Sequence, residues 1–199
     1  MILITGGTGF IGSRLASFLA NKGYEVRVVN EEITDIEKLR PHFKSAEFVV
    51  HLAGKKPNGI SEKRSNDMFL VNVLGTMNVV KLCLENGSKL INVGSMATES
   101  EYGISKTVAQ ELVRSYAKYQ NLKAVTIRPA GIYDESDTSV PYINKNYPLG
   151  ELVKDIENII ARHDFGKYRV YETKNFQQKL YFVKRKILAL KRRAVSIFK

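Results

Sequence analysis

Three glycines stand close together at the start of the chain, in the stretch MILITGGTGFIGSRLASFLANKGYEV. Gly6, Gly9 and Gly12 separate an apolar run, residues 2–5, from a segment with the apolar periodicity of a helix, residues 13–23. Glycine is costly inside regular structure, so three glycines at fixed spacing indicate that another group must approach the backbone closely. The pattern predicts a strand, a tight glycine turn and a helix.

Short apolar runs then alternate with helix-like segments. Strands are expected near residues 2–6, 25–29, 47–54, 89–95 and 123–129, and helices near 13–23, 68–87 and 102–121. Short strands that alternate with helices are typical of a parallel sheet covered on both faces. The sequence therefore predicts an α/β fold with a doubly wound parallel sheet. Beyond residue 130 we expect a loop over 134–150, a helix over 152–164 and a strand over 167–173.

Composition limits the class of protein. Apolar residues make up 44% of the 199 residues, which is enough for a packed core. No run approaches ~20 consecutive apolar residues, so no transmembrane helix is expected, and the N-terminus lacks the basic region of a signal peptide. The single cysteine, Cys83, is expected in the core and has no partner for an internal disulfide, which predicts a cytoplasmic location.

The basic residues are concentrated at the C-terminal end. The net charge is +11, and residues 151–199 carry 13 Lys or Arg against five Asp or Glu. Beyond residue 170 the one acidic side chain is Glu172. This uneven charge divides the chain into a predicted domain, residues 1–170, and a basic tail, residues 171–199.

Within the tail, residues 179–199 repeat apolar side chains at spacings of three and four, surrounded by eight Lys or Arg and no acid. A basic amphipathic helix of this kind can lie on an anionic membrane surface, here the inner face of the cell membrane. It could equally dock its apolar stripe on the core or on a second subunit. Nucleic-acid binding is a third alternative, which no recognised motif supports.

The glycine turn lies in the context in which a dinucleotide pyrophosphate binds, between a strand and the N-terminus of a helix. After the second strand, Asn30 stands where an acidic residue would accept hydrogen bonds from the ribose, and Glu31 and Glu32 follow. Two carboxylates would repel a 2′-phosphate and favour NAD, whereas Arg14 and Arg27 could bind one. The sequence therefore leans to NAD and leaves NADP open.

Tyr102 and Lys106 lie four residues apart in YGISK, on one face of a predicted helix. A lysine cation one turn away is expected to stabilise the phenolate and lower the tyrosine pKa from ~10 toward a useful range. Ser95 ends a strand, and its hydroxyl could hold a substrate carbonyl or alcohol. An isolated YxxxK match is more often an exposed helix face, but the glycine turn and Ser95 favour proton transfer coupled to hydride transfer.

Six motifs occur in the order TGGTGFIG, HLAG, VNVLGT, NVGS, YGISK and IRPAGIY, within residues 1–135. In this order they resemble the extended short-chain dehydrogenases/reductases, the group of nucleotide-sugar epimerases, dehydratases and reductases. The resemblance implies a Rossmann-type fold, NAD or NADP as cofactor, a nucleotide-sugar substrate and the catalytic residues Ser95, Tyr102 and Lys106. The cofactor-binding residues that it implies are Gly6, Gly9, Phe10, Ile11, Gly12, Asn30, Ile33, Leu52, Ala53, Gly54, Asn72, Tyr102, Lys106, Arg128 and Pro129.

In the resemblance these residues have separate roles. Phe10 and Ile11 join the glycines at the pyrophosphate, residues 52–54 line the adenosine side, and Ile33 touches the adenine edge. Arg128 and Pro129 lie beside the nicotinamide. For Asn72 and Arg128 the alternatives are an ordinary helix hydrogen bond and a surface charge.

The chain departs from the family pattern in four places. The segment after the second strand is short, so the usual second helix and third strand are expected to be shortened or missing. Tyr102 follows only seven positions after Ser95, which predicts an open or rebuilt sugar pocket. Met96 and Ala97 stand in place of the Asp-Glu pair of the dehydratases, which disfavours elimination of water. The substrate-binding region toward the C-terminus is expected to be reduced.

These observations predict an NAD(P)-dependent epimerase or keto-reductase acting on a nucleotide-activated sugar. The alternative is a regulatory or scaffold protein that binds a dinucleotide with little catalysis, or a subunit whose pocket is completed by a partner. The expected partners are the nucleotide sugar and a second copy of the chain, and no metal site is expected.

Overall fold

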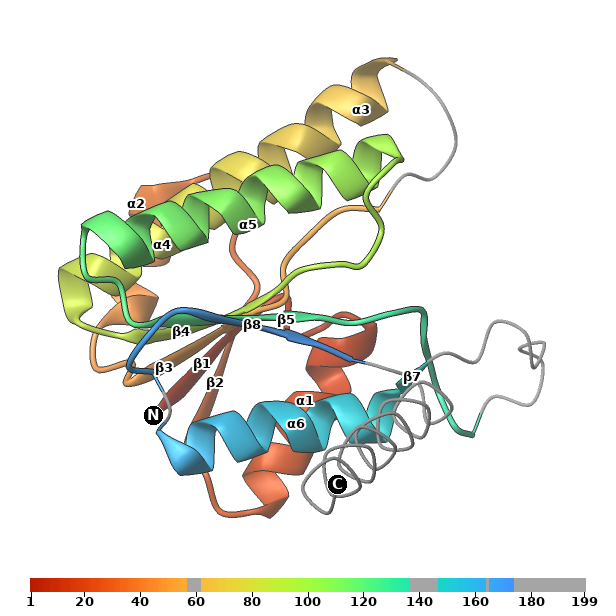
Figure 1. The fold of residues 1–199 in the computed structure, drawn as a ribbon. Helices are drawn as coiled ribbons and strands as arrows, with labels where there is room; N and C mark the ends of the chain where they lie inside the picture. The colour runs from red at the N-terminus through yellow and green to blue at the C-terminus, as the bar shows by residue number, and fades with distance from the viewer. Residues whose placement is uncertain (57–61, 137–146, 164, 174–199) are drawn as a thin grey trace, which may run out of the picture.

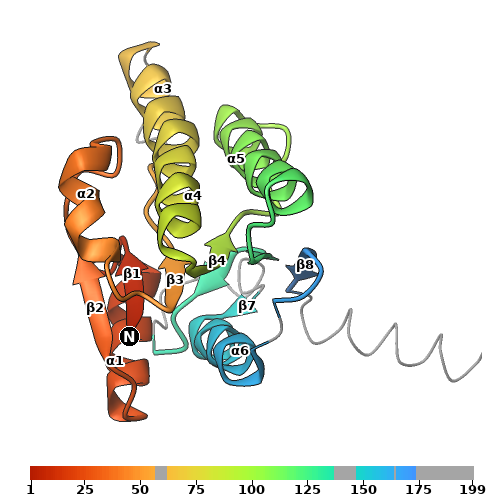
Figure 2. The ribbon, with the colours of Figure 1, turned by 90° about the vertical axis from the view of Figure 1, so that its left-hand side faces the viewer.

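The computed structural model describes residues 1–56, 62–136, 147–163 and 165–173, and a six-stranded parallel sheet forms its centre. The sheet has the order β2-β1-β3-β4-β5-β8, with every neighbouring pair parallel. Its strands are β1 (Ile2–Thr5), β2 (Val26–Val29), β3 (Phe48–His51), β4 (Lys89–Val93), β5 (Ala124–Arg128) and β8 (Arg169–Glu172). Figure 2 shows the sheet nearly along its strands.

Helices cover both faces of this sheet. They are α1 (Phe10–Asn21), α2 (Ile36–Phe43), α3 (Glu62–Phe69), α4 (Gly75–Asn86), α5 (Glu101–Tyr119) and α6 (Leu149–Arg162), with a π-helical turn, η1 (Leu70–Leu74), between α3 and α4. Figures 1 and 2 show α2, α4 and α5 on one face and α1 and α6 on the other. The Rossmann-type doubly wound sheet that the sequence predicts is confirmed. A small second sheet pairs β6 (Ile132–Tyr133) with β7 (Tyr147–Pro148).

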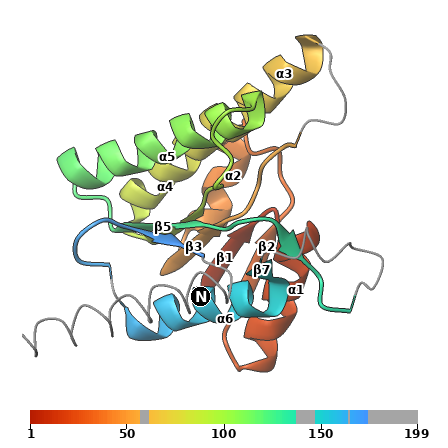
Figure 3. The ribbon, with the colours of Figure 1, turned by 45° about the vertical axis from the view of Figure 1, so that its right-hand side comes forward.

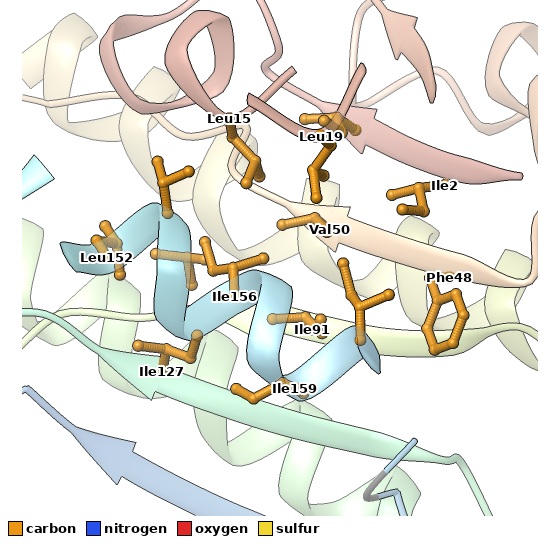
Figure 4. Packing of buried hydrophobic residues seen from close by; sticks show 14 of the residues in the cluster. Ile2, Leu15, Leu19, Phe48, Val50, Ile91, Ile127, Leu152, Ile156 and Ile159 are labelled. Atoms are coloured by element: carbon orange, nitrogen blue, oxygen red, sulfur yellow. The ribbon is translucent and has the colours of Figure 1, made fainter. Parts of the chain in front are cut away.

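Two hydrophobic clusters hold these layers together, one on each side of the sheet. Figure 4 shows the cluster on the face of the sheet that α1 and α6 cover, with Leu152, Ile156 and Ile159 of α6 and Leu15 and Leu19 of α1 packed onto the strands. The apolar side chains of α6 recur at intervals of three and four residues, which places them on one side of the helix. Each fully buried side chain of this size stabilises the fold by about 1.5–3 kcal/mol.

The second cluster lies under α2, α4 and α5 and contains Leu3, Leu39, Val79 and Leu90. Cys83 is fully buried among these residues, as the sequence predicts. Burial in apolar surroundings raises the pKa of its thiol, which stays protonated.

The segment between β2 and β3 is short, as expected. It forms one helix, α2, whose N-cap residue Asp35 accepts a hydrogen bond from the Lys38 amide at 3.2 Å. Among the described residues no strand lies beyond β2, so the sheet ends there. The second helix is shortened, and the usual third strand is missing from the part of the chain that the structure describes.

The C-terminal part of the domain joins the same sheet. β8 pairs with β5 and crosses the boundary predicted at residue 170, so the sheet extends two residues further. The loop predicted over 134–150 and the basic helix predicted over 179–199 lie largely or wholly outside the described residues.

The helical segment Ser65–Asn86 is long and apolar enough to cross a membrane by length and composition, although the sequence analysis expects no such helix. Half of its most apolar window is buried inside the protein. A helix packed in a protein core passes the same test, so this segment is weak evidence for a membrane span.

Candidate active site

A cleft of about 310 Å³ opens where the parallel strands end. The N-termini of α1 and α5 reach the same side, on the right in Figure 1, and Figure 3 shows this side turned forward. Ligands of open α/β sheets bind outside the carboxyl ends of the strands. The walls come from segments far apart in the sequence, namely α1, the end of β3, the loop after β4, α5 and the segment after β5.

The glycine turn between β1 and α1 lies directly before two residues of the cleft, Phe10 and Ile11. Gly6 has a φ of +67°, and a Cβ there would lie 2.6 Å from the Ala53 amide nitrogen. A Cβ on Gly12 would lie 2.3 Å from the Gly6 carbonyl oxygen. Glycine is therefore required at both positions, because the backbone segments are in direct contact. Phe10 and Ile11, which follow the turn, line the cleft.

The start of α1 is suited to an anion. Its N-cap residue, Gly9, provides no side chain to cap the first amides of the helix. These amide groups and the helix dipole favour a negative charge at this end. A tight, glycine-rich turn next to a helix N-terminus and a cleft fits the pyrophosphate of a dinucleotide.

The opposite wall carries the three residues that the sequence predicts as catalytic. Ser95, Tyr102 and Lys106 all line the cleft, and the Ser95 hydroxyl accepts a hydrogen bond from the Ala97 amide at 3.1 Å. Ser100 caps α5 by accepting a hydrogen bond from the Gly103 amide at 3.1 Å. A Cβ on Gly103 would lie 2.7 Å from the backbone of Ala97. This glycine lets the first turn of α5 lie against the loop that carries Ser95.

The pKa values differ in part from the expectation. Burial raises the pKa of Tyr102, and the nearby Ser95 side chain opposes part of this shift. The Tyr102 pKa is therefore raised, not lowered as the sequence predicts, because removal from water dominates. Burial also lowers the pKa of Lys106 to about 8, so that its ammonium group remains mostly protonated at neutral pH.

Two of the predicted cofactor residues hold the frame of the site. The Asn72 side chain is buried, accepts a hydrogen bond from the Lys55 amide at 2.8 Å and donates to the Ser105 hydroxyl at 2.9 Å. Arg128 donates from Nε to the backbone oxygen of Ser95 at 3.0 Å. Both side chains thus contact the segments that carry the catalytic candidates.

The remaining predicted residues lie in several places. Leu52, Gly54 and Pro129 line the cleft. Asn30 is exposed directly after β2. Ile33 is 6% exposed and packs against Gly75, where a Cβ would lie 2.6 Å from its Cγ2 atom. Its side chain therefore belongs mainly to the core, and contact with an adenine edge remains a prediction.

The sequence analysis missed several residues of the cleft. The cleft is also lined by Lys56, Gly94 and the segment 130–132. It is lined as well by Met96 and Ala97, which the sequence analysis noted only because they replace the Asp-Glu pair of the dehydratases. Residues 130–132 lie within the motif IRPAGIY, which could have pointed to them. Lys56 belongs to no motif. In the described part of the chain, no three His, Cys, Asp or Glu side chains are grouped as metal ligands.

Several known proteins are similar to this chain. The model of the "NAD dependent epimerase/dehydratase family" matches residues 2–155. UDP-glucose 4-epimerase of Vibrio cholerae is 29% identical over 170 residues, which cover 66% of this chain and 52% of that protein. UDP-glucose 4-epimerase of Erwinia amylovora is 26% identical over 185 residues, which cover 67% of this chain and 54% of that protein. The chain thus spans about half the length of the curated relatives it matches.

Among solved structures, MoeE5 in complex with UDP-glucose and NAD superimposes with a TM-score of 0.75. The match covers 87% of this chain and 75% of MoeE5, at 19% sequence identity. At this level of identity the similarity shows a shared fold.

Proposed function

Because the chain belongs to the NAD dependent epimerase/dehydratase family, we propose that it binds NAD and changes the oxidation state of one carbon of a nucleotide-activated sugar. Its reaction is either epimerisation, with transient oxidation, or net reduction of a keto-sugar. The observation that carries this proposal is one cleft lined both by Phe10 and Ile11, which directly follow the glycine turn, and by Ser95, Tyr102 and Lys106.

Both parts of the proposed ligand pair are supported by the comparisons. MoeE5 is described in complex with UDP-glucose and NAD, and the relatives from Vibrio cholerae and Erwinia amylovora are UDP-glucose 4-epimerases. UDP-glucose and its epimer are therefore the first substrates to test. On the cofactor side, the turn at Gly6, Gly9 and Gly12 would hold the pyrophosphate.

The proposed chemistry needs one proton transfer for each hydride transfer. Bound NAD would supply the hydride acceptor at the sugar carbon, and its reduced form the donor. As its phenolate, Tyr102 takes the proton from the hydroxyl on that carbon as the carbonyl forms, and the resulting phenol gives it back when the carbonyl is reduced. Return of the hydride to the other face of the carbonyl inverts the configuration of the carbon, which is epimerisation. If the substrate is already a keto-sugar, only the reduction takes place and the enzyme acts as a reductase.

Ser95 and Lys106 assist this transfer. The Ser95 hydroxyl, which lines the same cleft as Tyr102, orients the reacting oxygen. Lys106 lies one helical turn beyond Tyr102, and its ammonium group favours the phenolate that forms when Tyr102 gives up its proton. The raised pKa of Tyr102 means that the neutral phenol, the proton donor for reduction, predominates before substrate binds.

Elimination of water from the sugar is not part of the proposal. Met96 and Ala97 line the cleft directly after Ser95, and neither side chain can donate or accept the proton that elimination requires.

A homodimer is proposed as the working unit. Ile104 and Val108, one turn apart on α5, are 46% and 40% exposed, and Leu70 on the neighbouring η1 is 53% exposed. Exposed apolar side chains on two adjacent helical segments are typical of a subunit contact. Light scattering of the purified protein tests this, and a monomer at micromolar concentration would contradict it.

The test of the function is incubation with UDP-sugars and TDP-sugars plus NAD or its reduced form. Absorbance of reduced nicotinamide reports reduction, and sugar stereochemistry by NMR reports epimerisation. Tyr102→Phe is expected to lower kcat by about 10²–10⁴-fold while NAD still binds. Tyr119→Phe, at a residue 72% exposed on the same helix, is the control and should retain full activity.

A different result would favour the alternative function. If Tyr102→Phe leaves the biological activity intact while Gly12→Ala abolishes it, the protein binds a dinucleotide for regulation and the catalytic proposal is wrong.

A further inference from the structure

Four polar side chains form a row across the centre of the sheet. Thr5, His51, Asn92 and Thr126 stand opposite one another on β1, β3, β4 and β5. Each is at most 1% exposed. A buried polar group is costly unless it is hydrogen-bonded, so such a row needs partners. None of the four takes part in the proton transfer proposed above.

His51 lies at the centre of a chain of hydrogen bonds whose directions are fixed. Thr76 Oγ1 donates its one proton to the Asn72 carbonyl at 2.6 Å, so it accepts from His51 Nε2 at 3.0 Å. His51 Nδ1 is therefore unprotonated and accepts from Thr5 Oγ1 at 2.7 Å. The Ala53 amide donates to Thr5 Oγ1 at 3.4 Å. Burial lowers the pKa of His51 to about 3, in agreement with this neutral tautomer.

From Asn72 the chain continues to the helix that carries the phenol. The Asn72 side-chain amide donates to Ser105 Oγ at 2.9 Å, and Ser105 Oγ donates to the Tyr102 carbonyl oxygen at 2.8 Å. The same amide donates to the Lys55 carbonyl at 3.1 Å. A continuous buried route therefore runs from Thr5, directly before the glycine turn, to the backbone of Tyr102.

The middle of this route lies in the π-helical turn η1. Asn72 is its third residue, and Thr76 stands one turn later on α4. π-helical turns are rare inside α-helices and are often found at functional sites. The hydroxyl of Thr76 ties the Asn72 carbonyl to His51 and hence to the sheet, which fixes the direction of the Asn72 side chain.

We propose that His51 and Thr76 are positioning residues that hold Tyr102 in place relative to the glycine turn, through Asn72 and Ser105. This inference rests on the proposed function, because it assumes that Tyr102 transfers the proton. His51 and Thr76 touch neither substrate nor cofactor. They set where the phenol stands when a dinucleotide has its pyrophosphate at the turn, and reactions of this kind lose rate steeply with small displacements.

The test is Thr76→Val, which keeps the shape of the side chain and removes the hydroxyl between His51 and Asn72. We expect kcat to fall by about tenfold or more, while KM for the sugar and the Kd for NAD change by less than about threefold. Thr76→Ser, which keeps the hydroxyl, should restore most of kcat.

Ser88→Ala is the matched control. Ser88 is 2% exposed and its Oγ donates to the Ala46 carbonyl at 2.6 Å, at the end of the sheet opposite the cleft. The Ser88→Ala variant should lower the melting temperature about as much as Thr76→Val and leave kcat unchanged. Equal kcat in Thr76→Val and Ser88→Ala would overturn the proposal.

A second measurement is independent of turnover. Hydrogen exchange of the amides of residues 102–106 should be faster in Thr76→Val than in Ser88→Ala, because the Ser105 link to Asn72 is loosened. Unchanged exchange would contradict the positioning role. If the wild-type protein and Tyr102→Phe turn over the sugar at the same rate, the proposed function is wrong. The hydrogen-exchange data then decide by themselves whether the hydrogen-bonded route positions α5.

Discussion

The guanidinium group of Arg128 joins the backbone oxygen of Ser95, 3.0 Å from Nε, to the carboxylate of Glu172, 3.0 Å from Nη1. Arg128 ends β5 and Glu172 ends β8, so the outer strand of the sheet is tied to the loop that carries a catalytic candidate. Directly after β8, the Thr173 hydroxyl oxygen accepts a hydrogen bond from the Ala130 amide at 3.0 Å. The wall of the cleft is therefore braced from outside.

Replacement of this guanidinium group should affect catalysis more than folding. In Arg128→Met the Ser95 carbonyl loses its partner and the Ser95 hydroxyl is less well placed, so kcat is expected to fall by about tenfold. Steady-state kinetics measure this, with the nucleotide sugar that is converted in the incubation proposed above. Arg114→Met removes an exposed pair with Glu111 on α5 and should leave kcat unchanged. A full rate in Arg128→Met would show that the brace is dispensable.

The glycine turn is expected to tolerate no side chain at its third glycine. In Gly12→Ala the new Cβ would lie 2.3 Å from the Gly6 carbonyl oxygen and 2.5 Å from the Gly7 Cα atom. Backbone atoms must shift, and the free energy of unfolding should fall by about 1–3 kcal/mol. Isothermal titration should show no NAD binding. Gly166→Ala, where nothing lies within 4 Å of the new Cβ, is the control for both measurements.

The residues after β2 should select NAD over NADP. Glu31 and Glu32 are exposed there, and their charges repel the 2′-phosphate of NADP. We expect NAD to bind about tenfold more tightly than NADP, and the double variant Glu31→Gln, Glu32→Gln to narrow that ratio. Glu25→Gln, an exposed acid before the same strand, should leave it unchanged. Tighter binding of NADP by the wild-type protein would show that Arg14 or Arg27 determines the choice.

Lys106 should make stability depend on pH. Its folded pKa of about 8 lies below the usual 10.5, so between these values the unfolded chain binds more protons and stability rises with pH. At neutral pH the buried ammonium group costs on the order of 3 kcal/mol, and this cost disappears as pH approaches 10.5. Urea denaturation should therefore give Lys106→Met a larger free energy of unfolding than the wild type at pH 7.

The difference in unfolding free energy between Lys106→Met and the wild type should fall by about 2 kcal/mol between pH 7 and pH 9.5. Lys81→Met, at an exposed position on α4, is the control and should show the same pH dependence as the wild type. A difference that stays constant with pH would show that the ammonium group is better solvated than its burial indicates.

Much of the fold follows from the sequence, because parallel strands buried on both faces are short apolar runs. Val50 and Ile91 belong to such runs, and the helices between them have apolar residues at helical spacing. The convergence of Ser95, Tyr102 and Lys106 also follows from their places at the end of a strand and on one helix face.

Other features have no local pattern. The role of Arg128 depends on Glu172, 44 residues later, and that of His51 on hydroxyls from β1 and α4. The sequence of η1, LVNVL, has the composition of an ordinary helix, and tertiary contacts around Asn72 select the π-helical turn. The raised pKa of Tyr102 could not be predicted, because it depends on how deeply the first turn of α5 is buried.

The π-helical turn has a consequence for insertions and deletions in this chain. A π turn contains one residue more than the α-helical turn it replaces. Loss of a single residue from Leu70–Leu74 would therefore leave an unbroken α-helix in which the residues N-terminal to the deletion keep their direction around the axis, because the shorter turn still closes one full rotation. The Lys55–Asp67 ion pair and the burial of Met68 would survive such a deletion. A deletion of one residue within the regular α-helical part of α4 would instead rotate every residue before it by about 100° around the axis.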